Sequence, residues 1–549
     1  MKAVIKNMIE MKKICPIILS VLISSIALVS CDGLLGVDSK RLTTDEEYGL
    51  KSSSDSIYSI FGLFSQLEKI ADSYVLLGEL RADLLDVSET SDPDLREINA
   101  LNISKDNKYV NIKDYYAVIN NCNYIIRYLD TTVVDQGQKM KLRQYAAVKA
   151  IRAWTFMQIA LNFKEVKYYT DPILTVADAE RTDYPVYNFE QLSEVLIADL
   201  EPLKIVNMPI LGDVDAYNTS YSFFPVRFIL GDLYLWKGEY EKAAIEYREL
   251  MYEKRLTIDK TNTSYWVTVN NTISSSAYVN WLRSFLLASG EVITTILCPT
   301  EYGQDFYLDS LNSQSKIVPS AISISNWDAQ TYYLNEASNS QGDLRKYGSI
   351  WYKEVTTNPT SNNSYTGESG VKTYIYKYKV NPNNVIIYRS SLLYLRYAEA
   401  VNRLNKPRLA FAVLKYGLNS TNMINEKIVP ISEKGTSAPQ YMSFSDSRFI
   451  NNVGIRMRGL GNMDKDTAFY RIPKLENMHD SVLYVEDLIQ QELALETAYE
   501  GNRFQDLMRL ALRRGEPAYL ADKIALKHTA NKEEFRTKLT NPENWYIKY

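Results

Sequence analysis

The chain has 549 residues, 46% of them hydrophobic and 23% charged, so it can bury a large core and is neither collagen-like nor disordered by composition. Its 62 basic and 66 acidic residues give a net charge of −4 with no dominant basic block, so the footprint of a nucleic-acid-binding protein is missing. Only two histidines, His479 and His528, are present, which disfavours a histidine-rich metal site or a histidine base, and we expect no cofactor.

The first residues have the features of a bacterial lipoprotein signal peptide. Four lysines precede a mostly apolar run over residues 14–29, which is long enough for a signal peptide and too short for a confident membrane span. The run ends in Leu28-Val29-Ser30-Cys31, which resembles a lipobox, where the cysteine sulfur receives a diacylglycerol. We expect residues 1–30 to be a signal peptide and Cys31 to be the lipidation site.

The mature chain is expected to be tethered by this lipid alone. Residues 31–44 are polar, contain two glycines and lack periodicity, which is typical of a tether. No later segment reaches 18 uninterrupted apolar residues, so the acyl chains would be the membrane attachment. Either Met1 or Met11 fits as the start, and loss of residues 1–30 removes four lysines and one glutamate, which changes the net charge to −7.

Helical periodicity begins near Asp45 and continues to about residue 255. Apolar residues recur at intervals of three and four, which predicts a succession of helices joined by short polar connections. The predicted helices contain residues 57–67, 116–129, 141–162, 189–203 and 223–250.

The last of these segments matches a tetratricopeptide repeat. Counted from Phe224, five of seven signature positions fit, and the small residues Gly231 and Ala243 fall where two antiparallel helices must touch. A more degenerate unit has the same 12-residue interval from Ala398 to Ala410. An ordinary helical hairpin is the alternative for either unit.

The character changes between residues 256 and 390, where Asn, Ser, Thr, Gly and Tyr accumulate. Short alternating pieces such as 373–378 predict strands or loop edges. Helical order returns at Ser391, a loop-rich stretch covers residues 430–480, and a strong helix is predicted over 485–513. The expected fold is therefore mainly α, with a loop-rich, partly β insert.

That last helix carries the most specific motif. Glu492, Glu496 and Glu500 are spaced by four residues and would share a helix face with Arg503. A catalytic carboxylate cluster is one interpretation, but the mixture with arginine favours an internal ion-pair network.

The motifs together resemble the SusD/RagB-like outer-membrane lipoproteins of Bacteroidetes. The resemblance rests on segments that occur in the family's order along the whole mature chain: Gly78-Glu79-Leu80-Arg81-Ala82-Asp83, Tyr116 with Ile119 and Cys122-Asn123, Arg152-Ala153-Trp154, Gly290-Glu291-Val292-Ile293, Arg396-Tyr397-Ala398-Glu399-Ala400, Arg471-Ile472-Pro473, Gln491-Glu492-Leu493-Ala494-Leu495-Glu496 and Glu500-Gly501-Asn502-Arg503-Phe504-Gln505-Asp506-Leu507. Two pieces depart from the family's pattern, Lys164-Glu165-Val166-Lys167 and the Arg that begins Arg471-Ile472-Pro473.

The resemblance implies one SusD-like unit over residues 45–549, with about four tetratricopeptide-like hairpins in its parts 45–255 and 391–549 and a ligand face in the insert. It further implies a lid at the cell surface over a SusC-like TonB-dependent transporter in the outer membrane. Such a protein captures an oligosaccharide or polysaccharide and delivers it without catalysis.

Aromatic residues of the insert are the candidate glycan contacts, because sugars present flat C–H faces that stack on aromatic rings. Tyr302 and Trp327 rank first, since the family places ligand contacts in this zone, and burial in the core of the insert is the alternative for each tryptophan. The other candidates are Trp281, Trp266 and Trp351, with Arg81 and Asp83 as weaker ones.

Two other functions remain open. The same lid could serve peptides, which an open sheet edge or a charged terminus-binding pocket would indicate. A glycoside hydrolase needs two carboxyl groups about 5 to 10 Å apart across a cleft, and no motif marks such a pair. The mature chain keeps Cys122 and Cys298 besides Cys31, so no disulfide framework is expected, and a pairing of the two cannot be deduced.

Overall fold

The computed structural model describes residues 50, 53–134, 137, 139–214, 217–259, 281–298, 307–335, 338–355, 370–380, 383–460 and 470–548. Cys31, Trp266 and Tyr302 lie outside the described residues. The chain divides into two compact units, Met1–Lys51 and Ser52–Tyr549, and the elements below belong to the second.

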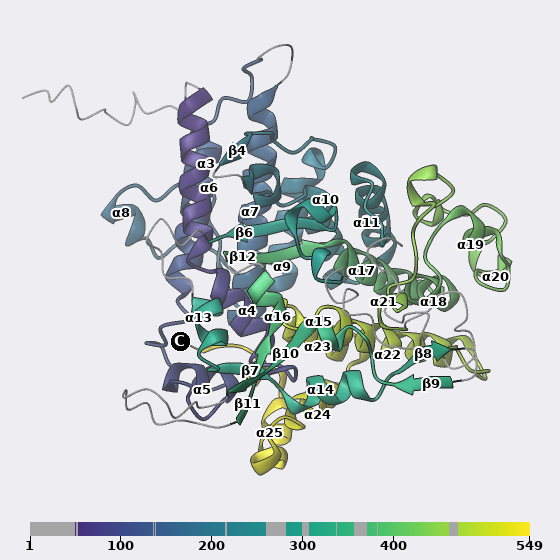
Figure 1. The fold of residues 1–549 in the computed structure, drawn as a ribbon. Helices are drawn as coiled ribbons and strands as arrows, with labels where there is room; N and C mark the ends of the chain where they lie inside the picture. The colour runs from purple at the N-terminus through teal and green to yellow at the C-terminus, as the bar shows by residue number, and fades with distance from the viewer. Residues whose placement is uncertain are drawn as a thin grey trace, which may run out of the picture. The chain divides into compact units, whose positions relative to one another are not determined.

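Helices dominate the first part of this unit, as the periodicity predicts (Figure 1). They are α3 (Ser53–Glu68), α4 (Ala71–Glu79), α5 (Pro93–Asn99), α6 (Ile112–Tyr128), α7 (Met140–Phe163), α8 (Val176–Ala179), α9 (Phe189–Leu200), α10 (Val226–Lys237) and α11 (Tyr240–Lys254). Short strands lie between them: β1 (Leu85–Val87), β2 (Val166–Lys167), β3 (Val186–Tyr187), β4 (Asp213–Val214) and β5 (Tyr217–Asn218).

Local sequence sets where these helices begin and end. The Asn188 side-chain oxygen accepts a hydrogen bond from the Gln191 backbone amide, and the Gln191 side-chain oxygen accepts one from the Asn188 backbone amide, which forms a capping box at the start of α9. Gly238 ends α10 in the left-handed conformation, which a residue without a side chain adopts at little cost.

Consecutive helices pack as pairs. Four such pairs are α6 with α7, α10 with α11, α17 (Ser390–Arg403) with α18 (Pro407–Lys415), and α23 (Arg503–Arg514) with α24 (Pro517–Ala525). Helix α11 packs on α17, so the N-terminal and C-terminal helical parts meet directly. The predicted mainly α fold is confirmed.

The predicted tetratricopeptide contact is present between α10 and α11. A Cβ atom added to Gly231 would lie 2.4 Å from Cε1 of Tyr247, so the ring packs directly on the glycine. The Tyr247 hydroxyl donates to Asp232 at 2.6 Å, and Ala243 is fully buried. The small residue at this position is therefore required by the close approach of the two helices.

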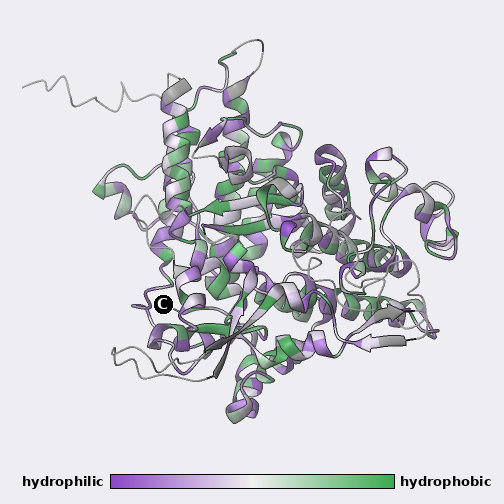
Figure 2. Ribbon diagram, in the orientation of Figure 1, coloured by the Kyte–Doolittle hydropathy of each residue, from purple (hydrophilic) through white to green (hydrophobic). Residues whose placement is uncertain are grey.

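The insert contains short elements and two-stranded antiparallel sheets. Its elements are β6 (Val292–Leu297), α13 (Tyr307–Ser313), β7 (Ile317–Pro319), α14 (Ala321–Asp328), β8 (Thr331–Asn335), β9 (Ser338–Gln341), α15 (Lys346–Ser349), β10 (Ile350–Val355), β11 (Gly370–Ile375), α16 (Tyr376–Val380) and β12 (Asn384–Arg389). The strand pairs are β1–β7, β2–β3, β4–β5, β6–β12, β8–β9 and β10–β11. The β6–β12 pair carries mostly hydrophobic residues (Figure 2), and β6 is buried against α3.

The strand predicted over residues 373–378 ends earlier than expected. Asn312 exchanges two hydrogen bonds with the backbone of Ile375, at 3.0 and 2.9 Å, and the chain then turns into α16. The turn brings the Lys377 ammonium within 2.7 Å of Glu500, so a buried charge pair outweighs the local β pattern.

The C-terminal part is again helical. Besides the helices already given it contains α19 (Ser420–Ile424), α20 (Ile431–Lys434), α21 (Met457–Leu460), α22 (Met478–Glu496), α25 (Lys532–Leu539) and the 3-10 helix η9 (Pro542–Trp545). None of the described helices combines the length and the apolar character needed to span a bilayer.

The single helix predicted over residues 485–513 is wrong, because the structure divides it into α22 and α23. Between them Tyr499 and Gly501 adopt positive φ angles of 69° and 86°, which no helix contains. Gly78 of α4 packs on this turn so closely that a Cβ atom there would overlap the Gly501 carbonyl. The turn is therefore fixed by contact with an element more than four hundred residues earlier.

Candidate ligand-binding site

Two of the motifs that carry the family resemblance, residues 78–83 and 500–507, contact each other. The Glu79 carboxylate accepts hydrogen bonds from the amides of Gly501 and Asn502, at 2.9 and 3.2 Å. Asp83 pairs with Arg503, and the Arg81 guanidinium lies 4.1 Å from the centre of the Phe504 ring. These two segments therefore join the N-terminal and C-terminal helices, and Asp83 is buried in an ion pair instead of lining a pocket.

The glutamates of α22 and the following turn form a buried ion-pair network, as the sequence predicts. The carboxylates are Glu291, Asp343, Glu492, Glu496 and Glu500, and the cations are Arg345, Lys377, Arg389, Arg456 and Arg458. Five charges of each sign balance, which offsets the cost of removing them from water.

The prediction that Arg503 pairs with these glutamates is wrong. The sequence places Arg503 beside Glu496 and Glu500, but Glu496 contacts Arg345, Arg389 and Arg458, at 2.8, 2.9 and 2.7 Å. The break between α22 and α23 turns Arg503 away toward Asp83. The helical spacing used for the prediction does not extend across the break.

The pKa directions agree with a structural role for this network. Burial alone would raise the pKa of Glu496, but Arg458, Arg389 and Arg345 lower it far below its ordinary value. Burial raises the pKa of Glu492, which Arg345 and Arg456 offset only in part. Glu496 is therefore held ionised, as a fixed charge that binds the insert to α22.

Two of the predicted aromatic contacts lie in the core. Trp327 on α14 has no exposed surface, and its indole N–H donates to the Leu495 carbonyl at 3.3 Å. Trp281 is 1% exposed and packs on Gly348, beside the cations of Lys377 and Arg458. Neither ring offers an open face on which a sugar could stack.

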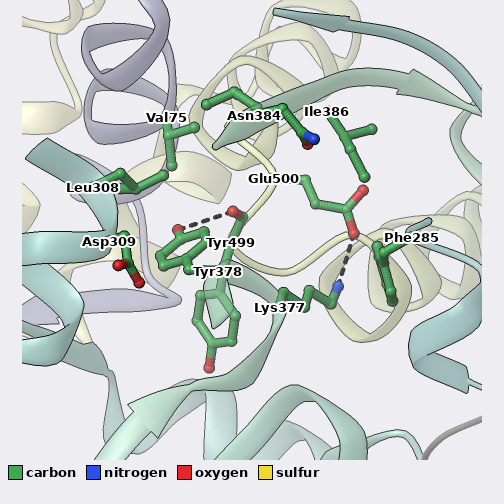
Figure 3. Close-up of a pocket in the computed structure, with 11 residues that line it drawn as sticks. Val75, Phe285, Leu308, Asp309, Lys377, Tyr378, Asn384, Ile386, Tyr499 and Glu500 are labelled. Atoms are coloured by element: carbon green, nitrogen blue, oxygen red, sulfur yellow. Dashed lines mark hydrogen bonds and ion pairs between the residues drawn. The ribbon is translucent and has the colours of Figure 1, made fainter. Parts of the chain in front are cut away.

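A small pocket lies where α16, β12 and the turn before α23 meet (Figure 3). Lys377 and Glu500 point toward each other across its wall, and the Tyr378 hydroxyl donates to the Tyr499 carbonyl at 2.9 Å. Its volume of about 40 Å³ is the space of a water molecule or two, so it cannot hold a sugar ring.

A much larger pocket opens on the surface of the insert. It has a volume of about 620 Å³, and its described lining residues are Tyr347, Trp351, Tyr376, Lys379 and Val380. Trp351 is 40% exposed and Tyr347 is 54% exposed, so both rings combine a packed part with a part open to solvent. Of the three predicted tryptophans within the described residues, Trp351 is the one on an open surface.

Three elements hold the rings of this pocket. Trp351 lies on β10 opposite Tyr374 of β11, and their ring centres are 6.0 Å apart. Tyr376 begins α16, 6.3 Å from the Trp351 ring, and the Lys379 ammonium lies 4.9 Å from the same ring centre. Tyr347 comes from the short helix α15, which precedes β10 directly.

The sequence analysis missed Tyr347 and Tyr376 as site residues. The tyrosines of the run Thr373-Tyr374-Ile375-Tyr376 were a usable signal of an aromatic surface, although β11 ends at Ile375 and Tyr376 lies in α16. Tyr347 gave no comparable signal. It lies in the short helix α15, and its place beside Trp351 becomes visible only once β10, which follows α15, is paired with β11.

The pocket has the chemistry of a binding surface. Aromatic rings can stack on the C–H faces of sugars, while the tyrosine hydroxyls and the lysine ammonium can hydrogen-bond to hydroxyl groups. None of its described lining residues is an aspartate or glutamate, so the carboxyl pair of a glycosidase is not present among them. Across the described part of the chain, no group of three His, Cys, Asp or Glu residues could hold a metal ion.

The two cysteines within the described residues are free and buried. Burial raises the pKa of the Cys122 thiol well above its ordinary value, and the same holds for Cys298. Both behave as small apolar residues and play no part in the pocket.

We compared the chain with family models, curated proteins and solved structures. No family model matches the chain. The chain is 23% identical over 535 residues to SusD-like protein P38 of Formosa agariphila, a match that covers 89% of this chain and 90% of the relative.

Solved structures share the fold. A SusD superfamily protein from Bacteroides vulgatus superposes with a TM-score of 0.57 and 15% identity over 90% of this chain and 95% of that one. A SusD-like carbohydrate-binding protein from Bacteroides fragilis gives a TM-score of 0.53 at 14% identity, over 85% and 88% of the two chains. Similar architecture at such low identity shows a shared fold.

Proposed function

We propose that this chain, a homologue of a SusD-like protein with the SusD superfamily fold, binds an oligosaccharide or polysaccharide at the cell surface without cleaving it. The observation that carries the proposal is the open aromatic pocket of about 620 Å³ around Trp351. The relatives support it, since one solved neighbour is a SusD-like carbohydrate-binding protein.

The geometry favours sugar over the two alternatives. Stacking surfaces with few charges suit a neutral glycan, whereas a hydrolase would need two acids that the described lining residues do not supply. A peptide lid would bind extended backbone at a sheet edge or hold a charged terminus, whereas three of the five described lining residues of this pocket are aromatic.

The proposed setting is the outer face of the outer membrane, with a lipid on Cys31 and a SusC-like TonB-dependent transporter as the partner that receives the glycan. A protein that must release its cargo should bind weakly, so we expect a dissociation constant between about 1 μM and 1 mM.

The test is a glycan array probed with the purified protein, followed by long incubation of each hit with the protein and chromatography of the products. Saturable binding of a glycan that returns at its original length is expected. Recovery of shortened oligosaccharide, or an absence of any glycan ligand together with binding of peptides, would contradict the proposal.

A further inference from the structure

A second pocket lies far along the chain from the aromatic one, at the C-terminal end. It has a volume of about 230 Å³ and is formed by Arg81, the loop after α5 and the segment from α25 to residue 548. It shares no described lining residue with the aromatic pocket, and its polar lining residues include Arg81, Asn102, Lys538, Asn544 and Lys548.

Arg81 is a buried cation whose hydrogen-bond partners among the described residues are all neutral. Its side chain is 1% exposed, and its N–H groups donate to the carbonyls of Leu77 and Trp545, at 2.8 and 3.1 Å, and to the side-chain oxygen of Asn162. These acceptors take three of the five N–H bonds that a guanidinium offers. Asp83, the acid nearest in sequence, is occupied by Arg503.

The electrostatics show that this charge is not compensated within the described residues. Burial lowers the pKa of Arg81 to about 9, and the group that opposes this shift among the described residues is the weak acid Tyr115. By contrast, Arg503, equally buried, has its pKa raised because Asp83 outweighs the burial. An uncompensated buried charge is costly, so a bound anion would stabilise this arrangement.

Two lysines add to the positive charge of the pocket. The Lys538 ammonium donates to the carbonyls of Ala100 and Leu101, at 3.2 and 2.9 Å, and the Lys548 ammonium donates to the Asn544 side-chain oxygen, at 3.4 Å. Burial lowers the pKa of Lys538, and the positive charge of Lys548 lowers this pKa further. The negative charge of Glu534 raises it, but only in part. The described lining contains three cations and no aspartate or glutamate.

We propose that this basic pocket binds a small oxyanion, namely a carboxylate, sulfate or phosphate group. A guanidinium and two ammonium groups around one cavity match the several acceptor oxygens of such a group. The volume is several times that of one water molecule in the liquid, so the group can be a free ion or can be carried by an acidic monosaccharide.

The test is isothermal titration calorimetry of the full chain at constant ionic strength, with sulfate, phosphate, glucuronate, glucose and chloride as titrants. Saturable binding of sulfate, phosphate or glucuronate is expected, with no binding of glucose or chloride. Binding of the inorganic ions alone identifies a free ion as the ligand, and tighter binding of glucuronate identifies a sugar-borne group. Binding of chloride equal to that of the oxyanions, or no binding at all, would overturn the proposal.

Two variants locate the binding without touching the buried arginine. Lys538→Gln and Lys548→Gln should each weaken oxyanion binding at least tenfold, while Lys532→Gln, at an exposed position of α25 outside the pocket, should leave it unchanged. Oxyanion binding retained in both pocket variants, or lost in Trp351→Ala, would place the anion elsewhere and overturn the assignment. Because glucose-type neutral ligands and oxyanions are tested at different pockets, this outcome is independent of the proposed glycan function.

Discussion

The Arg503 guanidinium donates two hydrogen bonds to the Asp83 carboxylate, from Nε at 2.7 Å and from Nη2 at 2.9 Å, although the two residues are 420 positions apart in the sequence. The pair is buried, and it lies beside the contact of Gly78 with Gly501. Together these contacts join α4 and the residues that follow it to the turn before α23 and the first residue of α23. We regard them as the reason why both segments carry recognisable motifs.

Replacing Arg503 with alanine should lower the free energy of unfolding by about 3–5 kcal/mol, because Asp83 would remain buried without its partner. Denaturation in urea measures this difference. The double variant Asp83→Ala/Arg503→Ala should be less destabilised than the sum of the two single variants. An unchanged midpoint for Arg503→Ala, with glycan binding lost, would instead move this arginine into the binding site.

The close approach of α10 and α11 gives a second prediction. Gly231→Ala should destabilise the protein by about 1–3 kcal/mol, because the new methyl group would force the buried Tyr247 ring to move. The matched control is Gly62→Ala in α3, where an added Cβ atom would have no neighbour within 4 Å. Alanine should raise the free energy of unfolding there by about 0.5–1 kcal/mol, because it has a higher helix propensity than glycine. Equal melting temperatures for the two variants would show that the packing of Tyr247 on Gly231 has no energetic weight.

The features of the fold that the sequence predicts are those that depend on residues close together along the chain. Helix positions depend on neighbours three or four residues apart, so α3, α6, α7 and α9 were predicted closely. The partner of Arg503 was not, because the turn at Tyr499 exists through contact with α4, which no local pattern contains.

The aromatic site shows the same limit. Trp327 and Trp351 lie in equally polar, irregular sequence, yet α22 covers the first and leaves the second open. Sequence could therefore predict that the insert carries aromatic contacts, and it could not select Trp351 over Trp327. The basic pocket had even less signal, since Arg81 and Lys538 meet only in the folded chain.

Stability should depend on pH through Asp72. Burial raises the pKa of its carboxyl group to about 7, a shift that the Ser73 amide opposes only in part. In the unfolded chain the ordinary pKa is about 3.9, so between pH 4 and pH 7 the folded state holds a proton that the unfolded state has lost. This group's contribution to the free energy of unfolding therefore falls as pH rises, by up to about 1.4 kcal/mol per pH unit.

Asp72→Asn removes that proton uptake. The variant should match the wild type near pH 4, exceed its stability at pH 8, and show a shallower decline between them, as measured by urea denaturation at a series of pH values. Other buried carboxyl groups contribute to the remaining decline, among them Glu68 and Glu79, whose pKa values burial also raises to about 7. A variant whose pH profile runs parallel to that of the wild type would refute the assignment to Asp72.

The anchor is tested at Cys31. Cys31→Ala should release the protein from membranes, because acyl chains contribute about 0.8 kcal/mol per buried CH₂ and no described helix can span a bilayer. Fractionation of cells into membrane and soluble pools measures this, with Cys122→Ala as the control that should stay membrane-bound. Complete retention of the Cys31→Ala protein in the membrane pool would contradict lipidation at this residue.

The central claim is that the pocket around Trp351 binds a glycan, and calorimetric titration of the array-identified glycan into Trp351→Ala tests it most directly. Loss of the exposed ring should weaken binding by about 1–3 kcal/mol without changing the melting temperature substantially, since Trp351 is 40% exposed. The control is Tyr58→Ala, which removes an aromatic ring that is 72% exposed on α3, away from the described lining of the pocket, and should bind as the wild type does. Wild-type affinity in Trp351→Ala would contradict the account.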